Sequence, residues 1–139
     1  MKNDTKALTY DLFALIDAMQ SGKKSWSEFD KIVTSGFKAF VPGQTQDINS
    51  FKTTMQSFAN GFSNASHTLT NVVAEDEKVM VREVWQGTHT GEFLGASPSN
   101  KKIEIVVFAL VVFDGDKIRE FHEVFDTLTL MRQTGVIEN

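Results

Sequence analysis

The sequence predicts an α+β fold, with helices in the first half and an antiparallel sheet in the second. Apolar residues recur every three or four positions in two segments before residue 62, which is the period of an amphipathic helix. From residue 67 onward the apolar period changes to two, which is the period of a strand. No linker, repeat or low-complexity tract divides the 139 residues, so residues 1–139 are expected to form a single domain.

Periodicity and a capping pattern predict the first two helices. One helix is expected from about Asn3 to Gln20, with Gly22 stopping it, because its apolar residues share one face: Leu8, Leu12, Leu15, Ile16 and Met19. A short second helix is expected to begin at Ser25–Glu28, which has the capping-box form, and to continue through Val33. The first helix is expected to bury its apolar face.

A short extended piece and a third helix are expected next. Alternating apolar residues in 36–42 suggest extended chain, which Pro42-Gly43 ends. Either Asp47 or Thr45 can cap the following helix, because each side-chain oxygen can accept a hydrogen bond from a free backbone amide. The apolar stripe of this helix is rich in phenylalanine and comprises Ile48, Phe51, Met55, Phe58 and Phe62.

Four strands are expected in the second half, at His67–Ala74, Lys78–Thr90, Lys102–Phe113 and Lys117–Phe125. Short turn sequences, EDE at 75–77 and DGD at 114–116, separate two of the neighbouring pairs, which predicts antiparallel hairpins. The segment 91–100 is the only long connection in this half.

The strand that ends at Phe113 is apolar on nearly every position from Ile103 onward. A strand with one wet face should alternate more clearly, so both faces are expected to be covered. Helices or a cavity can cover one face, and a second copy of the chain can cover the other, which predicts a homodimer through the sheet. The alternative is a sheet that curls far enough to bury both faces within one chain.

Composition narrows the classes of partner. With 41% hydrophobic and 23% charged residues the chain matches a globular protein, and no apolar run approaches the ~20 residues that cross a bilayer, so no membrane partner is expected. A formal charge of -4 without clustered basic residues argues against nucleic acid. Asp4, Asp11 and Asp17 interrupt the first apolar stretch, so no secretory signal is expected and a cytoplasmic location is predicted.

The last predicted strand carries the candidate chemistry. Residues of equal parity share a face, so Glu120, His122 and Asp126 point one way, opposite Phe121, Glu123 and Phe125. Composition does not choose which face is inward. If the histidine face lines a pocket, burial raises the carboxyl pKa values toward those of an acid or base that works near neutrality. If it faces water, these groups are solvated, and Asp126 can also cap a following helix.

Two motifs resemble a known family. Residues 87–95 read GTHTGEFLG, and residues 114–135 read DGDKIREFHEVFDTLTLMRQTG. Together they resemble the SnoaL-like polyketide cyclases, small proteins of the nuclear-transport-factor-like cone fold. Pro98 also fits, and His67 looks like the histidine of the FPDxxH run of the family. The resemblance implies a curved sheet that, with the N-terminal helices, encloses an apolar pocket for a small hydrophobic ligand.

The resemblance also implies a reaction. It is an intramolecular aldol closure, in which an aspartate takes a proton from carbon between carbonyls, and Asp126 stands at the matching position with His122 as its partner. Such a reaction needs no metal or cofactor, because the methylene is already acidic. Beside this catalytic pair, six further side chains are expected to contact the ligand: Glu120, His67, Trp85, His89, Phe58 and Phe62. For His89, a hydrogen bond that fixes its turn is the alternative, and for the aromatic residues it is simple core packing.

Two departures from the family pattern leave other functions open. Phe121-His122 replaces the usual His-Trp pair, and Phe62-Ser63-Asn64 replaces FPD, so an amide stands where the family has a carboxylate. These changes also suit a non-catalytic ligand-binding or assembly domain, or another proton-transfer enzyme. The three histidines do not have the local spacing of metal ligands, so no metal site is expected.

Overall fold

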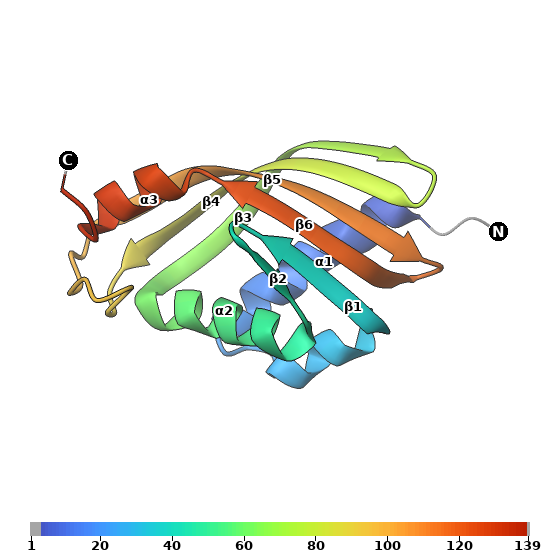
Figure 1. Ribbon diagram of the computed structural model, residues 1–139, viewed down its shortest axis with the longest axis horizontal. Coiled ribbons are helices and arrows are strands. Elements are labelled where there is room, and N and C mark those ends of the chain that lie inside the picture. Colours follow the sequence, from blue (N-terminus) through green and yellow to red (C-terminus); the bar gives the residue numbers. More distant parts are fainter. Residues whose placement is uncertain (1–3, 139) are drawn as a thin grey trace.

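The computed structural model describes residues 4–138 as one six-stranded sheet with helices. Figure 1 shows the strands curving over the helices. In chain order the elements are α1 (Thr5–Gln20), the 3-10 helix η1 (Trp26–Lys31), β1 (Val33–Val41), β2 (Gln44–Gln46), α2 (Ile48–Gly61), β3 (Phe62–Glu75), β4 (Lys78–His89), β5 (Lys102–Asp114), β6 (Lys117–Phe125) and α3 (Thr127–Thr134). The predicted α+β class is confirmed.

The sheet has the strand order β2-β1-β6-β5-β4-β3 and is mixed. The consecutive strands β3 to β6 pair antiparallel, as the short turns between two of their pairs predict. The first strand of the chain, β1, instead lies parallel to β6, and β2 extends that edge. No hairpin turn links β1 with β6, so local sequence gives no indication of their relative direction.

Two strand predictions differ from the structure. β3 begins at Phe62 directly after α2, five positions before the expected His67, and its first residues pair with the end of β4 at His89. The polar run Ser63-Asn64 conceals this start, because it lacks apolar alternation. The three-residue strand β2 was not predicted, and it places Gln46 on the buried side.

Helix α1 buries the predicted apolar face and runs along β3. Asp4 caps it by accepting a hydrogen bond from the Ala7 backbone N–H at 3.0 Å. The expected start at Asn3 lies outside the described residues. Asp17 lies on the same side of α1 as Phe13, one helical turn after it along the chain, so a carboxylate shares the face that turns toward the sheet.

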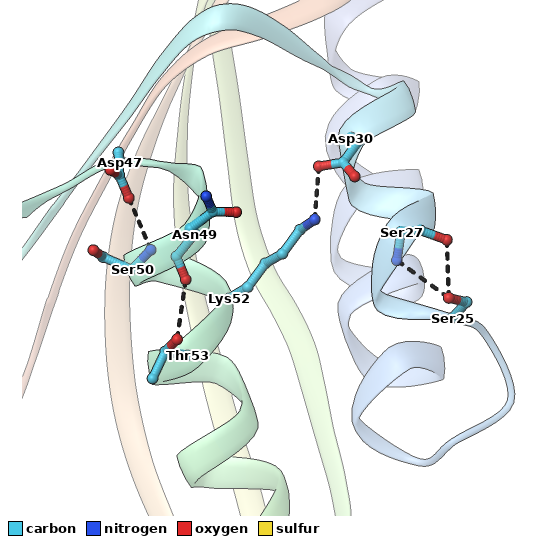
Figure 2. A network of polar contacts seen from close by, with 8 residues as sticks. All are labelled: Ser25, Ser27, Asp30, Asp47, Asn49, Ser50, Lys52 and Thr53. Atoms are coloured by element: carbon cyan, nitrogen blue, oxygen red, sulfur yellow. Dashed lines mark hydrogen bonds and ion pairs between the residues drawn. The ribbon is translucent and has the colours of Figure 1, made fainter.

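The capping box at Ser25 forms only in part (Figure 2). The Ser25 hydroxyl accepts from the Ser27 backbone N–H at 3.2 Å and also lies 2.9 Å from the Ser27 hydroxyl. The Glu28 carboxylate binds Lys31 at 3.0 Å instead of returning to the cap. The helix ends at Lys31, before the predicted Val33, which belongs to β1.

Asp47, the first of the two expected candidates, caps α2. Its carboxylate accepts from the Ser50 backbone N–H at 2.8 Å, and this hydrogen bond holds the pKa of Asp47 below its usual value. The ammonium of Lys52 lies 2.6 Å from Asp30, so an ion pair joins α2 to η1, as Figure 2 shows. The two helices are thereby held together under one end of the sheet.

The outer face of the sheet carries an exposed apolar strip centred on β5. Inward residues of β5 are buried, whereas outward Val106 and Phe108 are 37% and 46% exposed. Val124 of β6 is the direct neighbour of Phe108, and Met80 of β4 is the neighbour of Leu110, so these side chains form one outer strip. The sheet therefore does not curl far enough to bury both faces of β5. Among the described residues, no helix is both long and apolar enough to span a bilayer.

If the outer strip forms the predicted homodimer contact, Phe108→Glu is expected to weaken the dimer by about 30-fold, as loss of a central aromatic contact typically does. Light scattering at micromolar concentration measures this directly. Tyr10→Glu is the matched control, because Tyr10 is equally exposed but lies on α1, away from the strip. A monomeric parent protein under these conditions rejects the dimer.

Candidate active site

A cavity of about 310 Å³ lies between the inner face of the sheet, the helices α1 and α2, and the start of α3. Its lining is mainly apolar, with six aromatic residues: Phe13, Phe51, Phe58, Trp85, Phe93 and Phe125. Only two titratable side chains are among the lining residues, His67 and Glu123, and none of these residues is Lys or Arg. The cavity therefore suits an apolar ligand without negative charge.

His67 is held in one orientation by α1. It lies in β3 opposite Trp85 of β4, and its Nδ1 is 2.6 Å from Asp17 Oδ1. The His67 backbone N–H donates to the other Asp17 oxygen at 3.1 Å. An ionised carboxylate only accepts hydrogen bonds, so Nδ1 carries a hydrogen and donates it to Asp17. Nε2 is then the nitrogen available for chemistry.

Glu83 lies behind the cavity lining on β4. Its side chain has no exposed surface, and neither carboxyl oxygen has a hydrogen-bond partner among the described residues. His67 Nε2 is 3.9 Å from Glu83 Oε1, which is longer than a hydrogen bond. Burial, with smaller contributions from the nearby charges of Glu123 and Asp17, raises the pKa of Glu83 to about 9. Glu83 is therefore a neutral acid at pH 7.

Glu123 enters the cavity from β6. It faces inward with Phe121 and Phe125, and its neighbour across β5 is Ala109, the smallest side chain of the inward row of that strand. Burial raises the pKa of Glu123 to about 6, and the positive charge that His67 can carry partly offsets this effect. A carboxylate of this kind is ionised at neutral pH and is still more basic than an exposed one.

Three of the predicted ligand-contact residues line the cavity: His67, Trp85 and Phe58. Phe62 is outside the lining and packs with its ring centroid 4.9 Å from that of Trp85, so it supports the wall from behind. The core-packing alternative thus describes Phe62, whereas Phe58 both lines the cavity and packs against Phe62 and Trp85.

The structure places Asp126 outside the cavity. It is exposed and caps α3, accepting hydrogen bonds from the Thr129 hydroxyl at 2.6 Å and the Thr129 backbone N–H at 2.9 Å. These hydrogen bonds hold the pKa of Asp126 below its usual value, so the expectation of a raised pKa in an apolar site is wrong for this residue. The helix-cap alternative describes its placement.

His122 and Glu120 also lie on the outer face of β6. The His122 ring stacks on Phe40 at 4.3 Å between centroids, and its Nε2 is 2.9 Å from Glu120 Oε1. The opposite parity of the strand faces inward, so the structure brings Glu123, and not His122, Glu120 or Asp126, to the cavity.

His89 organises the glycine-bounded motif. It is fully buried, its Nδ1 lies 3.1 Å from the Ser99 hydroxyl, and its backbone carbonyl accepts from Asn100, which closes the long loop. Gly91 passes so close to Asn60 that a Cβ atom there would lie 1.9 Å from the Asn60 carbonyl oxygen. Only glycine fits at position 91 because of this close approach. His89 itself does not line the cavity.

Asp17, Glu83 and Glu123 were not predicted as site residues, although the sequence contains a pattern that points to them. Each is a carboxylate in phase with buried apolar positions of its element: Glu83 between Val81 and Trp85, Glu123 between Phe121 and Phe125. Acidic side chains are seldom fully buried without partners, so a carboxylate in phase with the core is an indication of a site.

Glu83 makes stability depend on pH. Between about pH 4.5 and 9 the folded protein keeps a proton that the unfolded chain releases, so the unfolding free energy falls by about 1.4 kcal/mol per pH unit in this window. Glu83→Gln is neutral in both states and removes this contribution. The variant is therefore expected to gain stability relative to the parent between pH 5 and pH 8, as measured by urea unfolding.

Glu75→Gln, at the exposed end of β3, is the control for this measurement and is expected to follow the parent at both pH values. Identical pH dependence in Glu83→Gln and the parent would show that Glu83 is already ionised in the folded protein.

Solved structures with the same fold are numerous. AclR from Streptomyces galilaeus, a candidate hydroxylase, has a TM-score of 0.82 at 19% identity, over 96% of this chain and 82% of that one. A candidate SnoaL-like polyketide cyclase from Jannaschia sp. CCS1 has a TM-score of 0.80 at 18% identity, over 99% of both chains. IdmH from Streptomyces antibioticus, a candidate polyketide cyclase, has a TM-score of 0.80 at 20% identity, over 96% and 99%.

These likenesses confirm the nuclear-transport-factor-like cone fold that the resemblance implied. No curated protein matches the chain in sequence. The family model described as SnoaL-like polyketide cyclase matches residues 13–134, which is most of the chain. The chain belongs to the SnoaL-like polyketide cyclase family.

Proposed function

We propose that the cavity catalyses proton transfer on a small, hydrophobic carbonyl compound, as in the aldol-type closure of a cyclase. The observation that carries this proposal is the pairing of one carboxylate of raised pKa, Glu123, with one oriented imidazole, His67, in the wall of the same apolar cavity. Membership of the family supports the reaction class.

In the proposed reaction Glu123 is the general base. Its carboxylate takes a proton from carbon next to a carbonyl, and the resulting enolate carbon attacks a second carbonyl of the same molecule. His67, held by Asp17, is the general acid and donates a proton from Nε2 to the new alkoxide. Apolar walls strengthen both steps, because charges interact more strongly where water is excluded.

The cavity also limits the substrate. Its volume of about 310 Å³ lies at the lower end of the range for small-molecule sites. The lining contains Glu123 but no Lys or Arg, and this disfavours a free carboxylate ligand because its negative charge would repel that of Glu123. The proposed substrate is therefore a neutral ketone or ester with an apolar body.

Proton abstraction can be tested without knowing the natural substrate, by following exchange of the α-hydrogens of 2-tetralone for deuterium by NMR. The parent protein is expected to accelerate exchange, and Glu123→Gln is expected to lose at least about 100-fold, because an amide cannot act as a base. Asp126→Asn is the matched control, since asparagine caps a helix as well as aspartate does and the site lies outside the cavity.

Two outcomes would contradict the assignment of Glu123 as the base. Loss of exchange in Asp126→Asn with retention in Glu123→Gln would return the role of base to Asp126. Saturable binding of 2-tetralone without any exchange in the parent would favour the alternative function, a ligand-binding domain of the same fold.

The pH dependence of exchange supplies an independent test. A general base works only when it has lost its proton, so the rate is expected to fall below about pH 6, tenfold per pH unit, as Glu123 becomes protonated. The measurement is the exchange rate at subsaturating 2-tetralone from pH 4.5 to 8. A rate that stays constant down to pH 4.5 contradicts the assignment of Glu123.

A further inference from the structure

Glu83 is a buried acid that the proposed reaction leaves unused. It is fully buried, both of its oxygens lack partners among the described residues, and apolar Val81 and Trp85 flank it on β4. An unpaired buried carboxyl lowers stability, and a valine or leucine at this place would pack without that cost. Packing alone therefore does not account for glutamate at position 83.

The neighbours of Glu83 are the two groups that the reaction employs. His67 Nε2, the nitrogen that Asp17 leaves available, is 3.9 Å from Glu83 Oε1. Glu123 approaches from β6, across the small Ala109 of β5, and is near enough for its charge to act on Glu83. Three titratable groups thus face Glu83: Asp17 from α1, His67 from β3 and Glu123 from β6. The strand β5 contributes only the apolar residues Val107 and Ala109.

We propose that Glu83 is a positioning residue that relays a proton from Glu123 to His67 beneath the cavity wall. This inference rests on the proposed function of the cavity. The proton balance closes: carbon gives a proton to Glu123, His67 gives its Nε2 proton to the alkoxide, Glu83 reprotonates His67, and Glu123 returns its proton to Glu83. No proton is gained or lost over the cycle, and between cycles these groups exchange their protons with solvent.

The geometry allows proton transfer between Glu83 and His67 with a small movement. The gap of 3.9 Å between His67 and Glu83 exceeds a hydrogen bond by about 1 Å, and such contacts in ligand-free sites often tighten when a substrate binds. Glu83 is neutral at pH 7, so it holds the proton that the relay needs. Its position behind the lining keeps it from contact with substrate, so it acts through His67.

Glu83→Gln tests the relay, because glutamine keeps the shape and the neutral state but cannot transfer a proton. Exchange of 2-tetralone is expected to be at least about tenfold slower, with binding changed less than about twofold. In the parent the rate is expected to fall above about pH 9, when Glu83 loses its proton, and this decline is expected to be absent in Glu83→Gln and present in Glu83→Asp. A parental rate and an unchanged decline in Glu83→Gln overturn the relay.

A second measurement decides the matter even if no exchange is found. The ¹⁵N shifts of the His67 ring in the parent are expected to change near pH 9, and Glu83→Gln is expected to abolish this step. Ring shifts that are the same in both proteins from pH 5 to 10 overturn the coupling. Absence of exchange in the parent with an intact step would remove the proposed reaction and leave the coupling of Glu83 to His67 in place.

Discussion

The hydrogen-bonded pair of Asp17 and His67 joins α1 to β3, and the arrangement of the cavity depends on it. Asp17 accepts both from the imidazole and from the backbone N–H of His67, so one carboxylate fixes the side chain and the strand that carries it. Charge-assisted hydrogen bonds of this type are stronger than neutral ones. The pair therefore sets the position of α1 over the sheet and leaves Nε2 of His67 directed toward Glu83.

This arrangement places acids where the fold would favour apolar residues. Glu83 and Glu123 lie in the inward rows of β4 and β6, whose other members form the two apolar clusters of the core. Burial then acts on the two carboxyls to different extents, which leaves Glu83 neutral and Glu123 ionised at pH 7. When two carboxyl groups in one site have different pKa values, one can act as an acid and the other as a base at the same pH. Burial of these two carboxyl groups thus lowers the stability of the fold and also gives them the pKa values that the proposed reaction needs.

The sequence predicted most of the fold because local rules specify most of it. The helical stripes, the Asp47 cap and the antiparallel order of β3 to β6 follow from periodicity, capping and short turns. The direction of β1, the strand β2 and the early start of β3 depend on pairing between distant segments, and such pairing leaves no local pattern. The single-domain expectation for residues 1–139 stays a prediction.

The site was harder to predict because its residues depend on which face of β6 points inward. From Phe121 to Phe125 the odd-numbered residues of β6 face inward, and a shift of one residue would exchange Glu123 for His122. The parity is set by Phe121, which packs against Phe51 and Phe13 in the core, a long-range contact that composition does not reveal. Asp126 lies just beyond the strand, where the chain turns into α3, and the requirement for a helix cap explains an aspartate there without any catalytic role. A family motif can thus contain residues that shape the fold beside residues that face the ligand, and only the packing of the inward row separates the two.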